Sequence, residues 1–224
     1  SQLLADINNG IFGKIGMISN TTDFINNIVR EAHNENTFRS TKRRTALSPA
    51  LSPDVTSYTC PTDLRDYKIV DIAPDDGEDR NFGAFHLIPV EQWQRYSQFG
   101  DFCIDDRDGV RTLFIQTRYA STSDLTSPIS STTAYITYYS KYPWQTSLGV
   151  YQQSSTASSD LLVASESEYD LILKKGIAKG RSLTRSEQID RVEAQKEYKD
   201  AQLAYASTNP DESQMMISTY AYQQ

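Results

Sequence analysis

The residues that carry most catalytic chemistry are few and scattered in this sequence. The two histidines, His33 and His86, fall in different predicted elements, with no cysteine or carboxylate at ligand spacing. A zinc site needs three or four such ligands in one place, so this pattern argues against one. The two cysteines, Cys60 and Cys103, form no Cys-x-x-Cys or Cys/His pattern and predict no disulfide framework. We therefore expect neither a metal site nor a cofactor.

The serines and carboxylates also lack a recognised catalytic pattern. The sequence has no Gly-x-Ser-x-Gly elbow and no His-Glu-x-x-His motif. Acidic clusters at 75–79 and 105–109 invite a calcium interpretation, but a calcium loop with Gly109 in sixth position would put Ile104 at the first ligand. Turns need Asp and Gly in any case, so we favour turns. A catalytic carboxylate pair stays open without specific support; we predict no enzyme and no catalytic residue.

A glycine-rich segment near the N-terminus resembles a phosphate-binding loop superficially. Gly10, Gly13 and Gly16 recur at every third position around Lys14. A P-loop needs Ser or Thr after its lysine and a strand before it, whereas here Ile15 follows and a helix is predicted to precede. The segment is better explained as a flexible joint.

The charge distribution restricts the partners. The 224 residues carry a net charge of -7, which argues against a sequence-reading nucleic-acid binder but allows DNA to slide past without sticking. One basic run stands out: Arg39, Lys42, Arg43 and Arg44. Two interpretations stay open for it. It is either a charged edge strand that blocks unwanted pairing, or a contact with an acidic partner or DNA phosphates.

Hydrophobic patterning predicts an α+β fold, with N-terminal helices, an antiparallel β-domain, a C-terminal helical hairpin and an extended tail. Thr21 or Thr22 is the expected cap of the second N-terminal helix. Asp106 to Gly109 predicts a hairpin turn, and Pro89 begins a short helix over 90–97. The predicted strands are 55–60, 67–72, 82–88, 102–105, 110–118 and 133–139.

Two capping boxes predict the C-terminal helices. Ser165 with Glu168 and Thr184 with Glu187 both have the required spacing. The second helix places Ala194, Tyr198, Ala201 and Tyr205 on one face, and the two helices should pack antiparallel. A serine-rich run over 152–159 suggests a linker before them. The predicted segments are 1–37 (helical), 38–150 (β-rich), 151–208 (helical hairpin) and 209–224 (extended arm).

Two segments are predicted to contact other proteins. A long Ser/Thr-rich loop over 121–133 is of the kind that forms contact surfaces or disordered tips. Its candidate contact residues are Ser123, Asp124, Leu125, Pro128 and Ile129. The C-terminal arm is apolar and β-prone, which suits a strand that pairs with another subunit; packing against its own β-domain is the alternative. Its candidate residues are Met215, Met216, Ile217, Tyr220 and Tyr222.

No signal peptide and no membrane span is expected, because the N-terminus has neither a basic region nor a long apolar run. The protein is therefore expected to be made in the cytoplasm and to have no membrane partner.

The order of segments resembles the head-to-tail adaptor (connector) family of tailed phages. The resemblance is carried by the tyrosine-rich strand 137–144 (TYYSKYPW), by 161–176, which runs from Leu161-Leu162 to LILKKG, and by 198–203 (YKDAQL). These are loose patterns that together span about residues 1–210.

The resemblance implies a structural virion protein at the head–tail junction. It would form a homo-oligomeric ring of 12 copies beneath the portal, contact tail (nozzle or tail-tube) and tail-fibre proteins, and line the channel for DNA ejection. By position, the family's portal-binding arm falls on Met215 to Tyr222. Another neck or tail-completion protein, or a hydrolase of unrecognised type, remain the alternatives.

Overall fold

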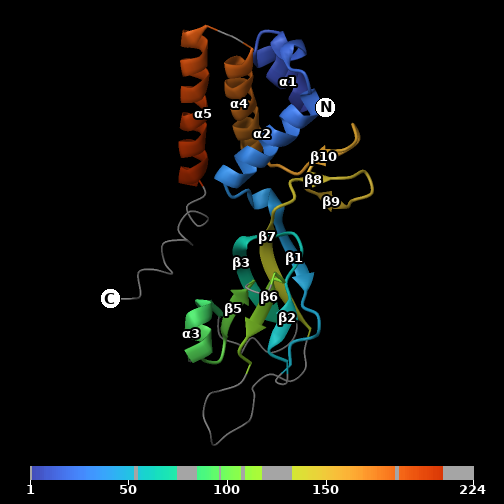
Figure 1. The fold of residues 1–224 in the computed structure, drawn as a ribbon, viewed down its shortest axis with the longest axis vertical. Coiled ribbons are helices and arrows are strands. Elements are labelled where there is room, and N and C mark those ends of the chain that lie inside the picture. Colours follow the sequence, from blue (N-terminus) through green and yellow to red (C-terminus); the bar gives the residue numbers. More distant parts are fainter. Residues whose placement is uncertain are drawn as a thin grey trace, which may run out of the picture. The chain divides into compact units, whose positions relative to one another are not determined.

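The chain belongs to the α+β class, as predicted (Figure 1). The computed structural model describes residues 2–52, 55–74, 85–95, 97–106, 109–117, 133–184 and 187–208. The chain divides into two compact units. A helical unit contains the residues up to Thr41 and from Lys141 onward, and a β unit is the continuous insert Lys42–Ser140. The predicted N-terminal and C-terminal helical segments thus come together in one unit.

The helical unit consists of two distant stretches of chain that share one hydrophobic core. In chain order its elements are α1 (Gln2–Gly10), η1 (Lys14–Met17), α2 (Thr21–Glu35), η2 (Arg39–Thr41), β8 (Trp144–Gln145), β9 (Tyr151–Gln152), β10 (Leu161–Leu162), α4 (Glu166–Leu183) and α5 (Gln188–Thr208). Helices α4 and α5 pack together as predicted, and α1 and α2 both pack on α4.

Glycines on α4 allow α1 to approach closely. A Cβ atom built on Gly176 would lie 2.4 Å from the Cδ1 atom of Ile7, and one built on Gly180 would lie 2.8 Å from the Cγ2 atom of Ile11. Both pairs are spaced by four residues, so Ile7 of α1 and Ile11 directly after α1 enter two gaps on α4. The predicted flexible joint therefore begins with a packed residue, because Gly10 ends α1 against Ile177.

Three helix-start predictions meet different outcomes. The capping box of Ser165 and Glu168 is present at the start of α4. At α2 the cap is Asn20, whose side chain accepts a hydrogen bond from the backbone N–H of Asp23, rather than Thr21 or Thr22. The second capping box is wrong: Thr184 ends α4 and its hydroxyl donates to the carbonyl of Gly180, while α5 begins only at Gln188.

The serine-rich run 152–159 is fixed to the helical unit rather than forming a free linker. The side chain of Asn26 exchanges two hydrogen bonds with the backbone of Ser155, at 3.0 and 2.9 Å. The carboxylate of Asp160 accepts hydrogen bonds from the backbone N–H groups of Thr156 and Ala157, at 2.7 and 2.8 Å. The hydrogen bonds to Asp160 hold its pKa below its usual range. The hydrogen bonds of Asn26 place the run against α2.

The β unit contains two sheets around a second hydrophobic core. Its elements are β1 (Lys42–Ala46), β2 (Ser57–Thr59), β3 (Leu64–Pro74), β4 (His86–Leu87), α3 (Val90–Arg95), β5 (Asp101–Asp105), β6 (Thr112–Ile115) and β7 (Ala134–Ser140). The strand orders are β1-β7-β3 and β2-β6-β5-β4. All pairs are antiparallel except β4 with β5, which is parallel and so departs from the predicted antiparallel domain.

The hairpin between β5 and β6 is confirmed. The strands pair antiparallel from Phe102 with Ile115 to Asp105 with Thr112. At the turn, the N–H of Gly109 donates to the carbonyl of Asp106 at 3.0 Å, and Gly109 has φ of 77°. Glycine reaches this left-handed region without strain, so the Asp and Gly residues serve the turn as predicted.

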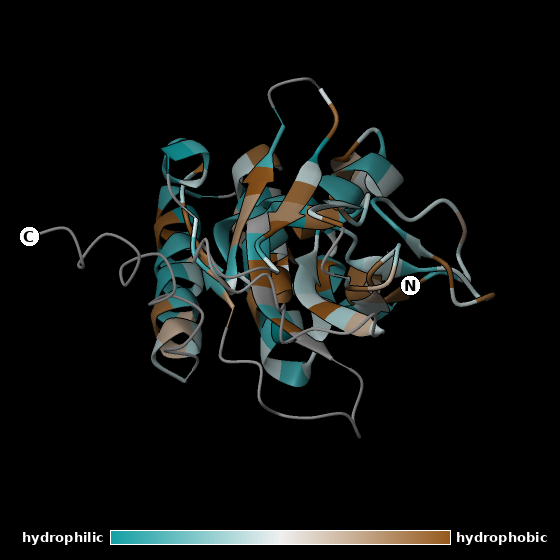
Figure 2. Ribbon diagram, turned by 90° about the horizontal axis from the view of Figure 1, so that it is seen from below, coloured by the Kyte–Doolittle hydropathy of each residue, from teal (hydrophilic) through white to brown (hydrophobic). Residues whose placement is uncertain are grey.

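The hydropathy of the residues varies along each helix and strand. Hydrophobic and hydrophilic stretches alternate along the ribbons of helices and strands (Figure 2), as expected for elements that bury one face. No helix among the described residues is long and apolar enough to cross a membrane.

Candidate functional site

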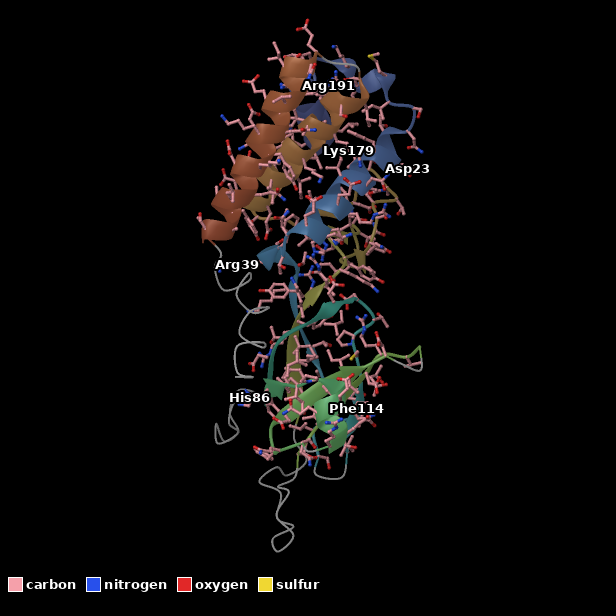
Figure 3. All side chains as sticks on the ribbon, turned by 60° about the vertical axis from the view of Figure 1, so that its left-hand side comes forward. Asp23, Arg39, His86, Phe114, Lys179 and Arg191 are labelled. Atoms are coloured by element: carbon pink, nitrogen blue, oxygen red, sulfur yellow. The ribbon has the colours of Figure 1, made fainter. Side chains whose placement is uncertain are left out.

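The basic run falls at the point where the chain passes from the helical unit into the β unit. Arg39 belongs to η2, whereas Lys42, Arg43 and Arg44 belong to β1 (Arg39 is labelled in Figure 3). In the described part of the chain β1 is an edge strand, paired only with β7. The edge-strand interpretation therefore describes the placement of the last three residues of the run.

Strand alternation separates the residues of the run. Lys42 and Arg44 are exposed, and the guanidinium of Arg44 lies 4.2 Å from the centroid of the Tyr135 ring. Arg43 is half-buried on the opposite face of the strand, and its charge acts on the phenol of Tyr138. The exposed cations Arg39, Lys42 and Arg44 are thus the ones that an acidic partner could reach.

The carboxylate of Asp63 in the β unit, together with two hydroxyl groups, forms a cluster with a structural role. Asp63 accepts hydrogen bonds from the hydroxyls of Tyr138, at 2.8 Å, and Ser140, at 2.6 Å. Burial and the hydrogen bond to Asp63 raise the pKa of Tyr138. The cluster ties the start of β3, where the register shifts after Leu64, to the end of β7. Each oxygen of Asp63 therefore accepts a hydrogen bond from β7, and these two bonds hold the strands together.

The cysteine and histidine side chains do not gather into a reactive group. Burial raises the pKa of Cys60 to about 11, so its thiol stays protonated at neutral pH. His33 is buried in the helical unit, with its Nε2 atom 3.4 Å from the hydroxyl of Thr41 and its ring edge against Phe38. His86 is exposed on β4 of the other unit (Figure 3). Among the described residues, no three His, Cys, Asp or Glu side chains could hold a metal ion.

A buried carboxylate organises the helical unit. Glu168 is fully buried and accepts hydrogen bonds from the backbone N–H groups of Ser165 and Ser40, at 2.7 and 3.2 Å, and from the hydroxyl of Tyr205, at 3.1 Å. It thereby joins the start of α4 and the end of α5 to the segment that enters β1. Because all three donors are part of the fold, this carboxylate has a structural role.

A second polar group lies between α2, α4 and α5. Lys175 pairs with Glu35 at 2.5 Å, Lys179 pairs with Glu31, and the hydroxyl of Tyr198 donates to Glu35 (Lys179 is labelled in Figure 3). Burial raises the pKa of Glu35, but the hydrogen bonds from Lys175 and Tyr198 outweigh it and hold that pKa below its usual range. The group fastens three helices.

The turn between β8 and β9 presents apolar side chains that sequence reasoning missed. Leu148 is 89% exposed, and Val150, two residues further on, is exposed as well. The turn is held by four hydrogen bonds, including Thr146 N–H to the carbonyl of Val150 at 2.8 Å and Gln145 Nε2 to the carbonyl of Gly149 at 3.1 Å. Leu-Gly-Val beside a Pro-Trp strand could have indicated this apolar hairpin turn.

The outer face of α5 is the other exposed apolar surface of the helical unit. Ile189, Val192 and Leu203 are all strongly exposed. They lie opposite the buried Ala194, Tyr198 and Tyr205. The sequence analysis predicted only the buried face of α5, although the three- and four-residue spacing of the exposed apolar residues is visible in the sequence in the same way.

The two remaining predicted contact segments lie outside the described residues. These are the loop residues Ser123, Asp124, Leu125, Pro128 and Ile129 and the arm residues Met215, Met216, Ile217, Tyr220 and Tyr222.

No protein-family model and no curated protein matches this chain.

Proposed function

We propose that this chain is a non-enzymatic structural subunit, the ring-forming adaptor that joins portal to tail in a tailed phage and forms part of the DNA channel. The observation that carries the proposal is the hydrogen-bonded turn that holds Leu148 in solvent. A rigid element that exposes a large apolar side chain lowers the ordering cost of a protein contact.

The other features fit this role. The exposed cations Arg39, Lys42 and Arg44 offer a contact for an acidic surface, while the net charge of -7 disfavours tight DNA binding. The buried carboxylate of Glu168 and the half-buried carboxylate of Asp63 both accept hydrogen bonds from donors within the fold. The order of segments that resembles the adaptor family supplies the specific assignment to the portal and tail.

Assembly with portal tests the proposal. The full chain, mixed with purified portal, should form rings visible by electron microscopy, and truncation after Thr208 should abolish binding while the remaining protein stays folded. Leu148→Ser should weaken ring assembly about tenfold, because a well-packed apolar anchor contributes more than 1 kcal/mol to an interface. Circular dichroism should show unchanged folding in both variants.

The matched control is Ser147→Ala, which alters the neighbouring exposed residue and should assemble normally. Rings that form equally well with the truncated chain and with Leu148→Ser would refute the adaptor assignment.

A further inference from the structure

The outer face of α5 carries a second heptad-spaced seam, which the packing of the helical unit does not use. Ile189, Val192 and Leu203 are 76%, 60% and 71% exposed. Between them lie the exposed Lys196 and Lys199, and after them the exposed Ala206. The spacing alternates between three and four residues along the whole helix, which is the spacing of core positions in a coiled coil. We call these six residues the outer seam.

The outer seam has apolar ends and a cationic centre. In the described part of the chain, no ion pair joins Lys196 or Lys199 to a carboxylate. Lysine at a core position of a coiled coil costs stability and selects the partner. A helix that packs here must therefore supply charge at its centre and apolar side chains at both ends.

The outer seam is poorly suited to pairing with a second α5. In an antiparallel pair the spacing places Val192 opposite Leu203 and Lys196 opposite Lys199, and in a parallel pair each lysine meets its own copy. Both arrangements therefore bring lysine against lysine in a desolvated contact, and like charges there disfavour the pair. The apolar ends would match well, so the lysines decide against self-pairing.

We propose that the outer seam of α5 is a docking surface for a helix of another polypeptide, with carboxylates at its central contact positions and apolar residues toward both ends. Charge complementarity to Lys196 and Lys199 selects this partner, and Ile189, Val192 and Leu203 provide the apolar contact. This inference specifies the chemistry of one partner in the proposed assembly. It rests on the proposed function only for the statement that the partner belongs to that assembly.

The protein itself can provide the matching helix as a probe. In the full-length variant Lys196→Glu/Lys199→Glu, the outer seam keeps its apolar ends and gains a carboxylate centre. We expect wild type alone and variant alone to sediment as monomers. An equal mixture should form a heterodimer at least about tenfold tighter than either self-pair, because like-charge contacts become ion pairs. Added salt should weaken the heterodimer, since screening reduces the attraction.

Two further variants test whether the seam makes this contact. Ile189→Ser/Val192→Ser/Leu203→Ser in either partner should abolish the heterodimer, and circular dichroism should show that the helices persist. Arg30→Glu/Lys141→Glu changes the net charge equally at exposed residues away from α5 and should not pair with wild type.

The proposal would be overturned by an equal mixture that stays monomeric, or by equal pairing with the Arg30→Glu/Lys141→Glu control. It would also be overturned if wild type alone dimerised and Lys196→Cys cross-linked two α5 helices. None of these outcomes depends on portal binding, so the seam and the adaptor role can fail separately.

Discussion

The helical unit and the β unit are each stabilised internally by a different kind of hydrogen bond. The helical unit joins residues far apart in sequence through side chains, as in the hydrogen bond of Tyr169 to Asp6 and the bond of Tyr205 to the carbonyl of Thr37. The β unit is one continuous insert, held mainly by strand ladders and by the cluster around Asp63. Both units have a hydrophobic core, but polar side chains supply the long-range hydrogen bonds of the helical unit, whereas backbone pairing supplies most of those of the β unit.

The two tryptophans allow each unit to be observed separately. Trp144 is buried in the core of the helical unit. Trp93 lies on α3 of the β unit, with its ring 6.0 Å from that of Phe114. Fluorescence of Trp93→Phe therefore reports the helical unit, and fluorescence of Trp144→Phe reports the β unit.

The largest expected effect is the loss of Glu168. Glu168→Ala removes the acceptor of the N–H groups of Ser40 and Ser165, while the hydroxyl of Tyr205 keeps the carbonyl of Thr37 as its acceptor. We expect the free energy of unfolding of the helical unit to fall by about 3 kcal/mol, because buried donors are costly to leave unpaired. Urea unfolding followed by Trp144 fluorescence measures this.

The control for this prediction is Glu166→Ala, which removes an exposed acid from the same first turn and should cost about 0.5 kcal/mol. An equal loss in the Trp93 transition would show that Glu168 does not act on the helical unit alone.

An intermediate effect is expected at Asp63 in the β unit. Asp63→Ala removes the acceptor of Tyr138 and Ser140 and should lower the free energy of unfolding by about 2 kcal/mol. Trp93 fluorescence should report the loss. Asp71→Ala, at an exposed position on β3, should leave the transition within about 0.5 kcal/mol of wild type. If the backbone ladders alone held the β unit, both variants would behave alike.

The smallest expected effect depends on pH and sharpens the contrast within the helical unit. The backbone N–H groups of Ala157 and Thr156 hold the pKa of Asp160 below its usual value of 3.8. The stabilisation is therefore fully present above that value and is lost as pH falls through the lower folded-state pKa. Wild type should be more stable than Asp160→Asn at pH 7, and the difference should shrink as pH falls below about 4.

The comparison for this titration is Asp200→Asn, which changes an exposed acid on α5. A stability difference for Asp160→Asn that stays constant from pH 7 to about pH 2 would contradict the assigned role of the charge.

The sequence was informative where local rules decide the structure. The capping box at Ser165 and the Asp-Gly turn at Gly109 were predicted because short-range hydrogen bonds and backbone angles determine both. The capping box predicted at Thr184 and Glu187 was wrong, because Thr184 ends α4 and its hydroxyl bonds back to that helix. The joining of α1 and α2 to α4 depends on contacts between residues more than 100 positions apart, which periodicity does not report.

Of the candidate site residues, the basic run could be read from composition, but its division between exposed and half-buried residues follows from β1 pairing. Leu148 escaped notice because a single leucine in a turn gives no periodic signal. The outer seam of α5 was readable in principle, yet only the packing of the inner stripe shows which face is left exposed.

The two gaps at Gly176 and Gly180 limit how α1 can move along α4. Ile7 and Ile11 each occupy one gap, so any slide shorter than a full helical turn would drive both side chains into the flanking residues. The helices can therefore keep their alignment or shift by about 5.4 Å, with few stable positions between. We therefore expect a force that pulls α1 along α4 to be resisted until it reaches a threshold, above which α1 moves by one helical turn in a single step.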